Sequence, residues 1–98
     1  MAVSALVLLG QTIREIRIGR GMTQQQLADL CSRHRTFIIS IEKGRQNAST
    51  MTLIRLASAL RVLPSELFGK FTKSVMRSSV LSSESRDDDL DIDRIRVG

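Results

Sequence analysis

The sequence predicts an all-α fold, with a globular helical part over residues 1–69 and a C-terminal extension over residues 70–98. Apolar residues recur at helical spacing along most of the first part, and residues that begin or end helices separate these segments. Hydrophobic residues make up 42% of the chain and aromatic residues only 3%, so the core is expected to be aliphatic. A chain of 98 residues has room for one small domain, which dimerisation would help to stabilise.

The first predicted helix runs from about residue 6 to residue 19, and Gly21 ends it. Residues 1–10 are apolar and form either an arm or the lead-in to this helix. They lack the basic start and cleavage signal of a secretory peptide and are too short to span a bilayer, so we expect no membrane association. Four residues at helical spacing are expected to face the core: Leu6, Leu9, Ile13 and Ile16.

The segment 22–44 predicts two short helices with a tight connection. Thr23 can cap the first helix, with Gln26 as its capping-box partner three residues later. Gly44 closes the second helix, because glycine tolerates the left-handed conformation found at helix ends. The expected buried face of the first helix contains Leu27, Ala28, Leu30 and Cys31.

The second of these helices, over about residues 33–43, has two distinct faces. Ile38 and Ile41 are three residues apart and share an apolar face, which Phe37 flanks. A helix anchored by these isoleucines turns another stripe outward. That stripe contains Arg35, Thr36, Ile39 and Ser40.

Two more helices are expected to complete the globular part. A polar loop leads to a helix over residues 50–61, capped by Ser49 or Thr50. Pro64 fits the first turn of a short helix over residues 64–68, because the missing amide is not needed there. The longer helix is expected to be mostly buried through Leu53, Ile54, Leu56, Ala57 and Leu60.

A set of residues at fixed spacing runs through this part of the chain: Gly21, Met22, Thr23, Gln24, Leu27, Ala28, Ile38, Ile41, Glu42 and Gly44. With this set the sequence resembles the helix-turn-helix of the lambdoid phage repressor and Cro group, the XRE family, from about residue 9 to residue 68. The resemblance implies a five-helix lambda-repressor-like DNA-binding domain. Within the family, the controller proteins of restriction–modification systems are most similar at Arg35, Thr36, Phe37, Ile38 and Asn47.

The resemblance implies a sequence-specific transcriptional regulator that binds palindromic double-stranded DNA as a homodimer, either a restriction–modification controller or a phage-type repressor. A helix fits the major groove, where Arg35 can pair with guanine and Thr36 can contact a base edge or a thymine methyl group. Ile39 and Ser40 lie further along the same stripe. The alternative for Arg35 is a phosphate contact without sequence information. The candidate contacts to the DNA backbone are Gln24, Arg33, Lys43, Arg45 and Asn47.

The resemblance also implies two structural contacts. An ion pair between Arg17 and Glu42 would tie the first helix to the end of the 33–43 helix, the alternative being a solvated arginine. Family members often pair through the region of the fifth helix, so a dimer contact is expected within residues 61–71. Leu67 and Phe68 either stay partly exposed for this contact or complete the core. The candidate interface residues are Leu63, Leu67, Phe68 and Phe71.

Charge is distributed unevenly along the chain. Residues 1–77 carry 12 Lys and Arg against 4 Asp and Glu, a net +8, whereas residues 78–98 carry 3 against 6, a net −3. A basic globular part suits a polyanion such as DNA, because phosphate neutralisation supplies most of the sequence-independent affinity. Charge alone does not distinguish this function from a merely basic soluble protein, but the helix-turn-helix resemblance does.

The start of the extension, after residue 70, allows two interpretations. Phe71, Val75 and Met76 can line one side of a sixth helix through about Leu81. The many Ser, Thr and β-branched residues of this segment leave a strand open as the alternative.

The acidic segment 87–93 favours disorder, with a short exchanged strand as the alternative because Leu90 and Ile92 alternate with charged neighbours. This segment motivates a second function, an antitoxin whose tail over residues 70–98 binds and blocks a partner toxin. A protein-interaction adaptor that has lost DNA binding is the third alternative.

No catalytic constellation or cofactor motif is visible, so we expect neither an enzyme nor a bound cofactor. Cys31 and His34 cannot supply the four ligands of a zinc site alone, so no metal site is expected; Cys31 is interpreted as a core residue and His34 as either a DNA contact or an uninvolved side chain. The aspartates between residues 87 and 91 lack the glycine and terminal glutamate of an EF-hand loop. A single cysteine permits no internal disulfide and suits a reducing cytoplasm.

Overall fold

A computed structural model describes residues 4–77, and over this range all regular secondary structure is helical. The all-α fold predicted from the sequence is therefore confirmed for the described part of the chain. The elements are α1 (Ala5–Gly19), α2 (Gln24–Leu30), α3 (Arg35–Glu42), α4 (Thr50–Leu60), the 3₁₀-helix η1 (Pro64–Phe68) and α5 (Lys73–Val75).

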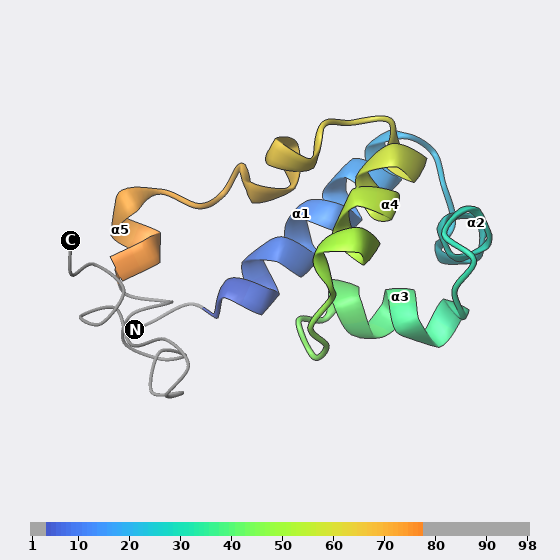
Figure 1. The fold of residues 1–98 in the computed structure, drawn as a ribbon, viewed down its shortest axis with the longest axis horizontal. Helices are drawn as coiled ribbons and strands as arrows, with labels where there is room; N and C mark the ends of the chain where they lie inside the picture. Colours follow the sequence, from blue (N-terminus) through green and yellow to red (C-terminus); the bar gives the residue numbers. More distant parts are fainter. Residues whose placement is uncertain (1–3, 78–98) are drawn as a thin grey trace.

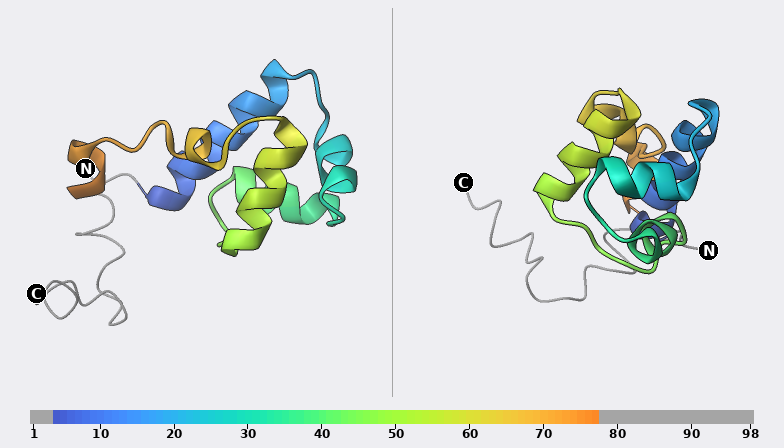
Figure 2. Two further views of the ribbon diagram at one scale, coloured as in Figure 1. Left: turned by 45° about the horizontal axis from the view of Figure 1, so that its top comes forward. Right: turned by 90° about the vertical axis from the view of Figure 1, so that its right-hand side faces the viewer.

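The helices α1, α3 and α4 form a compact group, with α2 at one end (Figure 1). In Figure 1 α2 is seen end-on while α3 runs across the view, and the right-hand view of Figure 2 shows the reverse, so these two helices cross steeply. Helix α5 lies at the opposite end of the molecule from α2 (Figure 1). This arrangement leaves α3 along one edge of the domain, where a long ligand can approach it.

The core is aliphatic, as the composition predicts. Each of the first four α-helices and η1 contributes at least one fully buried side chain, so the five elements share a single core. The largest fully buried residues are Ile13, Leu27, Ile38, Leu56, Leu60 and Leu67.

Two expectations about burial are wrong. Leu30 is 61% exposed and Ile54 is 40% exposed, although both were expected on buried faces. Leu30 lines a surface groove together with Ser58 and Ala59 of α4, whose small side chains leave it open. Leu67, for which the sequence left exposure and burial open, has no exposed area and completes the core.

Local capping explains where most of the helices begin. Thr23 and Gln26 form the expected capping box, with Thr23 Oγ1 accepting from the Gln26 amide at 3.0 Å and Gln26 Oε1 accepting from the Thr23 amide at 2.8 Å. Ser49, rather than Thr50, caps α4. Helix α3 begins at Arg35 instead of residue 33, because His34 is its N-cap residue; the His34 side chain makes no capping hydrogen bond.

The C-terminal extension is described only as far as residue 77. A short helix, α5, occupies Lys73–Val75, with Thr72 as its side-chain cap. The remainder of the expected sixth helix and the acidic segment lie outside the described residues, as does most of the alternative strand. No helix within residues 4–77 has the combination of length and apolar character that crossing a membrane requires.

Candidate nucleic-acid interface

Helix α3 buries one face and exposes the other at its N-terminal end. Ile38 is fully buried and Ile41 is 3% exposed, both in the common core. Arg35 and Thr36 are exposed in the first turn of the helix. Ile39 and Ser40 are half-buried. The face opposite the two isoleucines therefore presents an arginine and a threonine at its tip.

Two glycines allow α1 to pack closely on the C-terminal end of α3. A Cβ atom at Gly10 would lie 2.2 Å from the Ile41 carbonyl oxygen. Gly44 has a φ of +70°, and a Cβ there would lie 2.7 Å from the Cα atom of Val7. Any side chain at position 10 would push the helices apart, so the depth at which α3 sits depends on these positions.

A buried polar network joins the same end of α3 to α1 and α2. Arg17 donates from Nε to Glu42 Oε2 at 2.5 Å and from Nη2 to Glu42 Oε1 at 3.1 Å, with both residues buried. Gln24 Nε2 donates to the same Oε1 at 3.1 Å, and Arg17 Nη1 donates to the Met22 carbonyl at 2.8 Å. The Glu42 carboxylate thus holds the end of α3, the start of α2 and helix α1 in fixed relation. A bidentate Arg–carboxylate pair adds geometric specificity to this contact.

The candidate backbone-contact residues lie at both ends of α3 and at the start of α2. Lys43, Arg45 and Asn47 are exposed in and after the turn that follows α3. Arg33 is exposed before α3, and its guanidinium carbon lies 4.0 Å from the centroid of the Phe37 ring. This stacking restricts the Arg33 side chain while keeping its charge in water. Gln24, in contrast, is half-buried through its bond to Glu42, so only part of its amide is available to a ligand.

Cys31 and His34 do not form a metal site with other described residues. Within residues 4–77 no group of three or more His, Cys, Asp or Glu side chains could hold an ion. Burial raises the pKa of the Cys31 thiol, against the opposing effects of the Arg33 and Arg55 guanidinium groups. The Cys31 side chain is 3% exposed and belongs to the hydrophobic core, in agreement with its interpretation as a core residue.

The candidate dimer residues fall into two groups. Leu63 is 66% exposed and Phe68 is 42% exposed, and the Phe68 ring meets the half-buried Phe71 ring edge-to-face at 5.6 Å. Leu67 is fully buried and cannot present surface to a second copy without disturbing the core. Leu63, Phe68 and Phe71 remain the surface candidates.

Comparison with known proteins identifies the family. A family model described as "Helix-turn-helix" matches residues 13–67, more than half of the chain. The chain belongs to this helix-turn-helix family. As the sequence predicts, it is an XRE-type transcriptional regulator, and the family consists of DNA-binding regulators rather than enzymes.

Several of the relatives that the comparisons found are controller proteins. Control protein C.BamHI of Bacillus amyloliquefaciens is 40% identical over 62 residues, which cover 62% of this chain and 76% of that protein. The crystal structure of the restriction-modification controller protein C.AhdI from Aeromonas hydrophila is 40% identical with a TM-score of 0.63, covering 64% of this chain and 96% of that one. The tetramer of controller protein C.Esp1396I in complex with its natural 35 base-pair operator is 30% identical with a TM-score of 0.62, covering 72% and 93%.

Two features of this helix-turn-helix protein were missed at the sequence level. Gly10 was interpreted only as the end of an apolar stretch, although a glycine among residues of helical spacing signals a close backbone approach. Ser32, in the turn between α2 and α3, has a φ of +56°, a left-handed conformation that costs a non-glycine residue about 1–2 kcal/mol. Nothing in the local sequence signals this conformation at a serine.

Proposed function

We propose that this helix-turn-helix protein is a controller-type regulator that binds a palindromic operator as a homodimer and reads bases with the tip of α3. The observation that carries the proposal is the exposure of Arg35 and Thr36 above the buried pair Ile38 and Ile41. Its relatives among the restriction-modification controllers support this class of function. We expect the protein to act in the cytoplasm, where operator DNA is found.

The base contacts follow from the order of residues along α3. Arg35 presents a planar set of donors, which fits the two acceptors of guanine in the major groove. Thr36 offers a hydroxyl group and a methyl group, so it can contact either a polar base edge or thymine. Ile39 and Ser40 lie one turn further along α3 and are half-buried. We therefore assign them contacts only to DNA atoms that lie close to the helix in the major groove.

The phosphate contacts are assigned to the residues that flank the two ends of α3 and to the start of α2. Exposed Arg33, Lys43 and Arg45 supply positive charge, while Asn47 supplies a neutral donor. Gln24 is held by Glu42 and can offer its remaining amide hydrogen to a phosphate at the start of α2. Contacts of this kind set the register of the protein on the duplex, whereas the contacts to base edges determine which DNA sequence is bound.

Dimerisation doubles the number of base pairs that α3 can read. Two-fold symmetric proteins of this kind place their recognition helices about 34 Å apart, one helical turn of DNA. We assign the contact to the exposed apolar surface of Leu63, Phe68 and Phe71. The related C.Esp1396I controller binds its operator as a tetramer, which supports assembly on DNA.

The test is selection of bound duplexes from a random pool, followed by titration of the selected site. A palindromic site should emerge, and Arg35→Ala should weaken its binding by about 1–3 kcal/mol and relax the preference at one base pair per half-site. Arg14→Ala is the matched control, since Arg14 is exposed on α1 and should change only the non-specific, salt-dependent binding. Selection without any preferred sequence, or equal effects of the two variants, would contradict the assignment.

A further inference from the structure

A surface groove lies between the C-terminal ends of α1 and α4 and helix α2, and the proposed DNA contacts do not use it. It has a volume of about 520 Å³ and adjoins a second groove of about 480 Å³ along α2. In Figure 1 the C-terminal ends of α1 and α4 lie at the upper edge of the domain, whereas α3 lies along the lower edge. A duplex bound to α3 therefore leaves this groove open.

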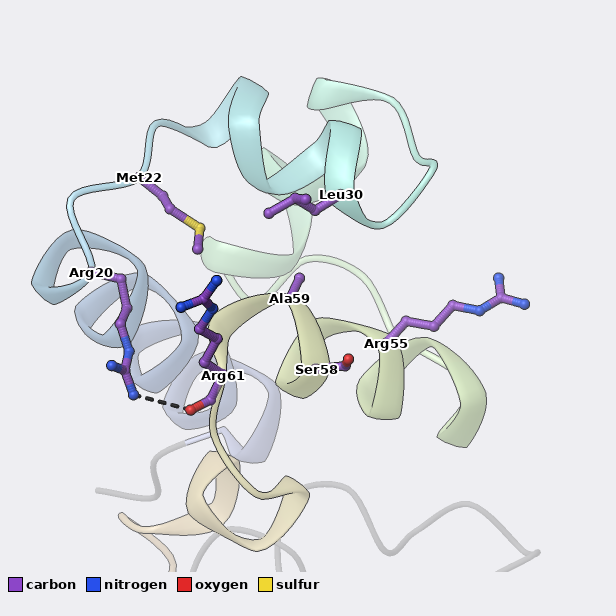
Figure 3. A pocket seen from close by; sticks show the side chains of 7 residues that line it. All are labelled: Arg20, Met22, Leu30, Arg55, Ser58, Ala59 and Arg61. Atoms are coloured by element: carbon purple, nitrogen blue, oxygen red, sulfur yellow. Dashed lines mark hydrogen bonds between the residues drawn. The ribbon is translucent and has the colours of Figure 1, made fainter.

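The groove combines an apolar surface with positive charge. Met22 and Leu30 point into it from the α2 side and Ala59 from α4 (Figure 3). Arg61 rises between them, and the Arg20 guanidinium lies beside it and donates to the Arg61 carbonyl at 3.1 Å (Figure 3). A ligand that fits this surface needs both apolar and acidic groups.

The arginines of the groove have no acidic partners within residues 4–77. The two ion pairs found there use Arg17 and Lys70, so Arg20, Arg55 and Arg61 pair with no carboxylate. Asp29 lines the adjoining groove, where its carboxylate accepts a hydrogen bond from Gln25 at 2.8 Å and forms no ion pair with these arginines. The positive charge of the groove is therefore available to a ligand.

The backbone at Arg61 adds an independent observation. Arg61 ends α4 in the left-handed region, with a φ of +62°, a position at which glycine is usual because other residues are strained there. Hydrogen bonds from the Arg61 amide to the Ser58 carbonyl at 3.1 Å and from the Val62 amide to the Ala57 carbonyl at 3.0 Å hold this conformation at the end of α4. Here the strained residue is the one whose guanidinium enters the groove (Figure 3).

We infer that this groove binds the acidic segment of the same protein, Asp87–Asp93. That segment reads Asp-Asp-Asp-Leu-Asp-Ile-Asp, with five aspartates around two aliphatic residues. In an extended segment alternate side chains face opposite sides, so Leu90 and Ile92 would lie together against Met22 and Leu30. The aspartates on the other side would face the arginines at the rim.

The length of chain outside the described residues allows this contact. Nine residues, 78–86, separate the end of the described chain from Asp87, and they span up to about 32 Å when extended. The described part measures 43 Å along its longest axis, with α5 toward one end (Figure 1). Because this reach is shorter than the long axis and the groove lies toward α2, the linking residues must be almost fully extended for the acidic segment to approach the groove of its own chain. The groove of the neighbouring copy in a dimer is the other position that the segment could occupy.

The experiment is photo-cross-linking in the full chain, with the reactive residue benzoylphenylalanine in place of Leu90. We expect cross-links to Met22, Leu30 or Ala59, located by mass spectrometry of the digested product. The apparent mass of the product on a denaturing gel shows where the segment binds. A product with the mass of one chain comes from binding to its own chain, and a product with the mass of two chains comes from binding to the neighbouring copy. Cross-links to α3 would overturn the inference, because the acidic segment would then compete with DNA, and so would the absence of any cross-link.

Two variants in the same chain test the chemistry of the groove. Arg61→Gly removes the guanidinium and suits the left-handed backbone, while Leu30→Ser changes an exposed side chain, so both should fold. Each should lower the cross-link yield by about fivefold, the size expected for loss of one apolar or charged surface contact. Met51→Ser is the matched control, because Met51 is 57% exposed on α4 but does not line the groove, and its yield should not change. Unchanged yields in both groove variants would refute the assignment.

Discussion

The two ends of α3 are built in opposite ways. At the C-terminal end, Gly10 and Gly44 bring α1 into direct contact with the backbone, and Glu42 is buried in its pair with Arg17. At the N-terminal end, the cap residue His34 makes no side-chain bond, and Arg35 is exposed. One end is fixed by packing and the other is left to solvent.

This difference shows how a short helix can be both rigid and accessible. A helix of eight residues has little stability of its own and takes its position from tertiary contacts. Concentrating those contacts at one end leaves the polar residues of the other end without internal partners. If the comparison is right, substitutions at the fixed end should change stability, and substitutions at the exposed end should change binding.

The largest effect is expected for Glu42→Ala, which leaves the buried Arg17 guanidinium without its carboxylate. Breaking one side of a buried pair costs about 3–5 kcal/mol, which would appear as a lower urea midpoint in equilibrium unfolding. The control is Glu15→Ala, because the Glu15–Lys70 pair is exposed and worth less than about 1 kcal/mol. The double variant Arg17→Met with Glu42→Leu should recover much of the loss, since it removes both charges. Equal effects of Glu42→Ala and Glu15→Ala would show that the buried network does not fix α3.

The next effect concerns the close approach of α1 to α3. Gly10→Ala places a methyl group against the Ile41 carbonyl and should destabilise the fold by about 3 kcal/mol. Gly19→Ala is the matched control in the same helix, because nothing lies within 4 Å of its added Cβ. That control should be neutral or stabilising by about 0.5–1 kcal/mol, since alanine favours the helix. The stabilities of the two variants are compared by thermal unfolding. If Gly10→Ala leaves the stability unchanged, α1 and α3 can move apart without a cost in free energy.

The smallest effect is expected at the exposed end. His34→Asp supplies the missing N-cap acceptor for α3 and should stabilise the protein by about 0.5–1 kcal/mol. The same carboxylate would face DNA phosphates and should weaken operator binding. His34→Ser adds a cap without a charge, so it should stabilise the fold and leave binding close to normal. A His34→Asp variant that binds the operator as well as the unmodified protein would place this end of α3 away from the DNA.

Much of the fold could be predicted because its signals are local. The capping box of Thr23 and Gln26 and the end of α3 at Gly44 depend on residues a few positions apart. The burial of Ile38 and Ile41 follows from their spacing along one helix. The candidate readout residues Arg35 and Thr36 were found by the same periodicity, and their exposure agrees with it.

The errors came from contacts between distant segments. Leu30 was expected to be buried because it lies three residues after Leu27, but small residues on α4 leave it uncovered. For Leu67 the sequence left exposure and burial open, and only the packing of η1 on the core shows that it is buried. The role of Gly10 appears only when α1 is placed against α3.

By itself, the order of residues determined where most of the helices begin and end and which side of α3 carries an arginine and a threonine, because helix periodicity and capping act over a few residues. Only the tertiary structure decided which apolar side chains are covered and how deeply α3 sits, because burial depends on what distant helices bring to the same place. The packing at the C-terminal end of α3 and the basic groove beside α2 both depend on such contacts between distant helices.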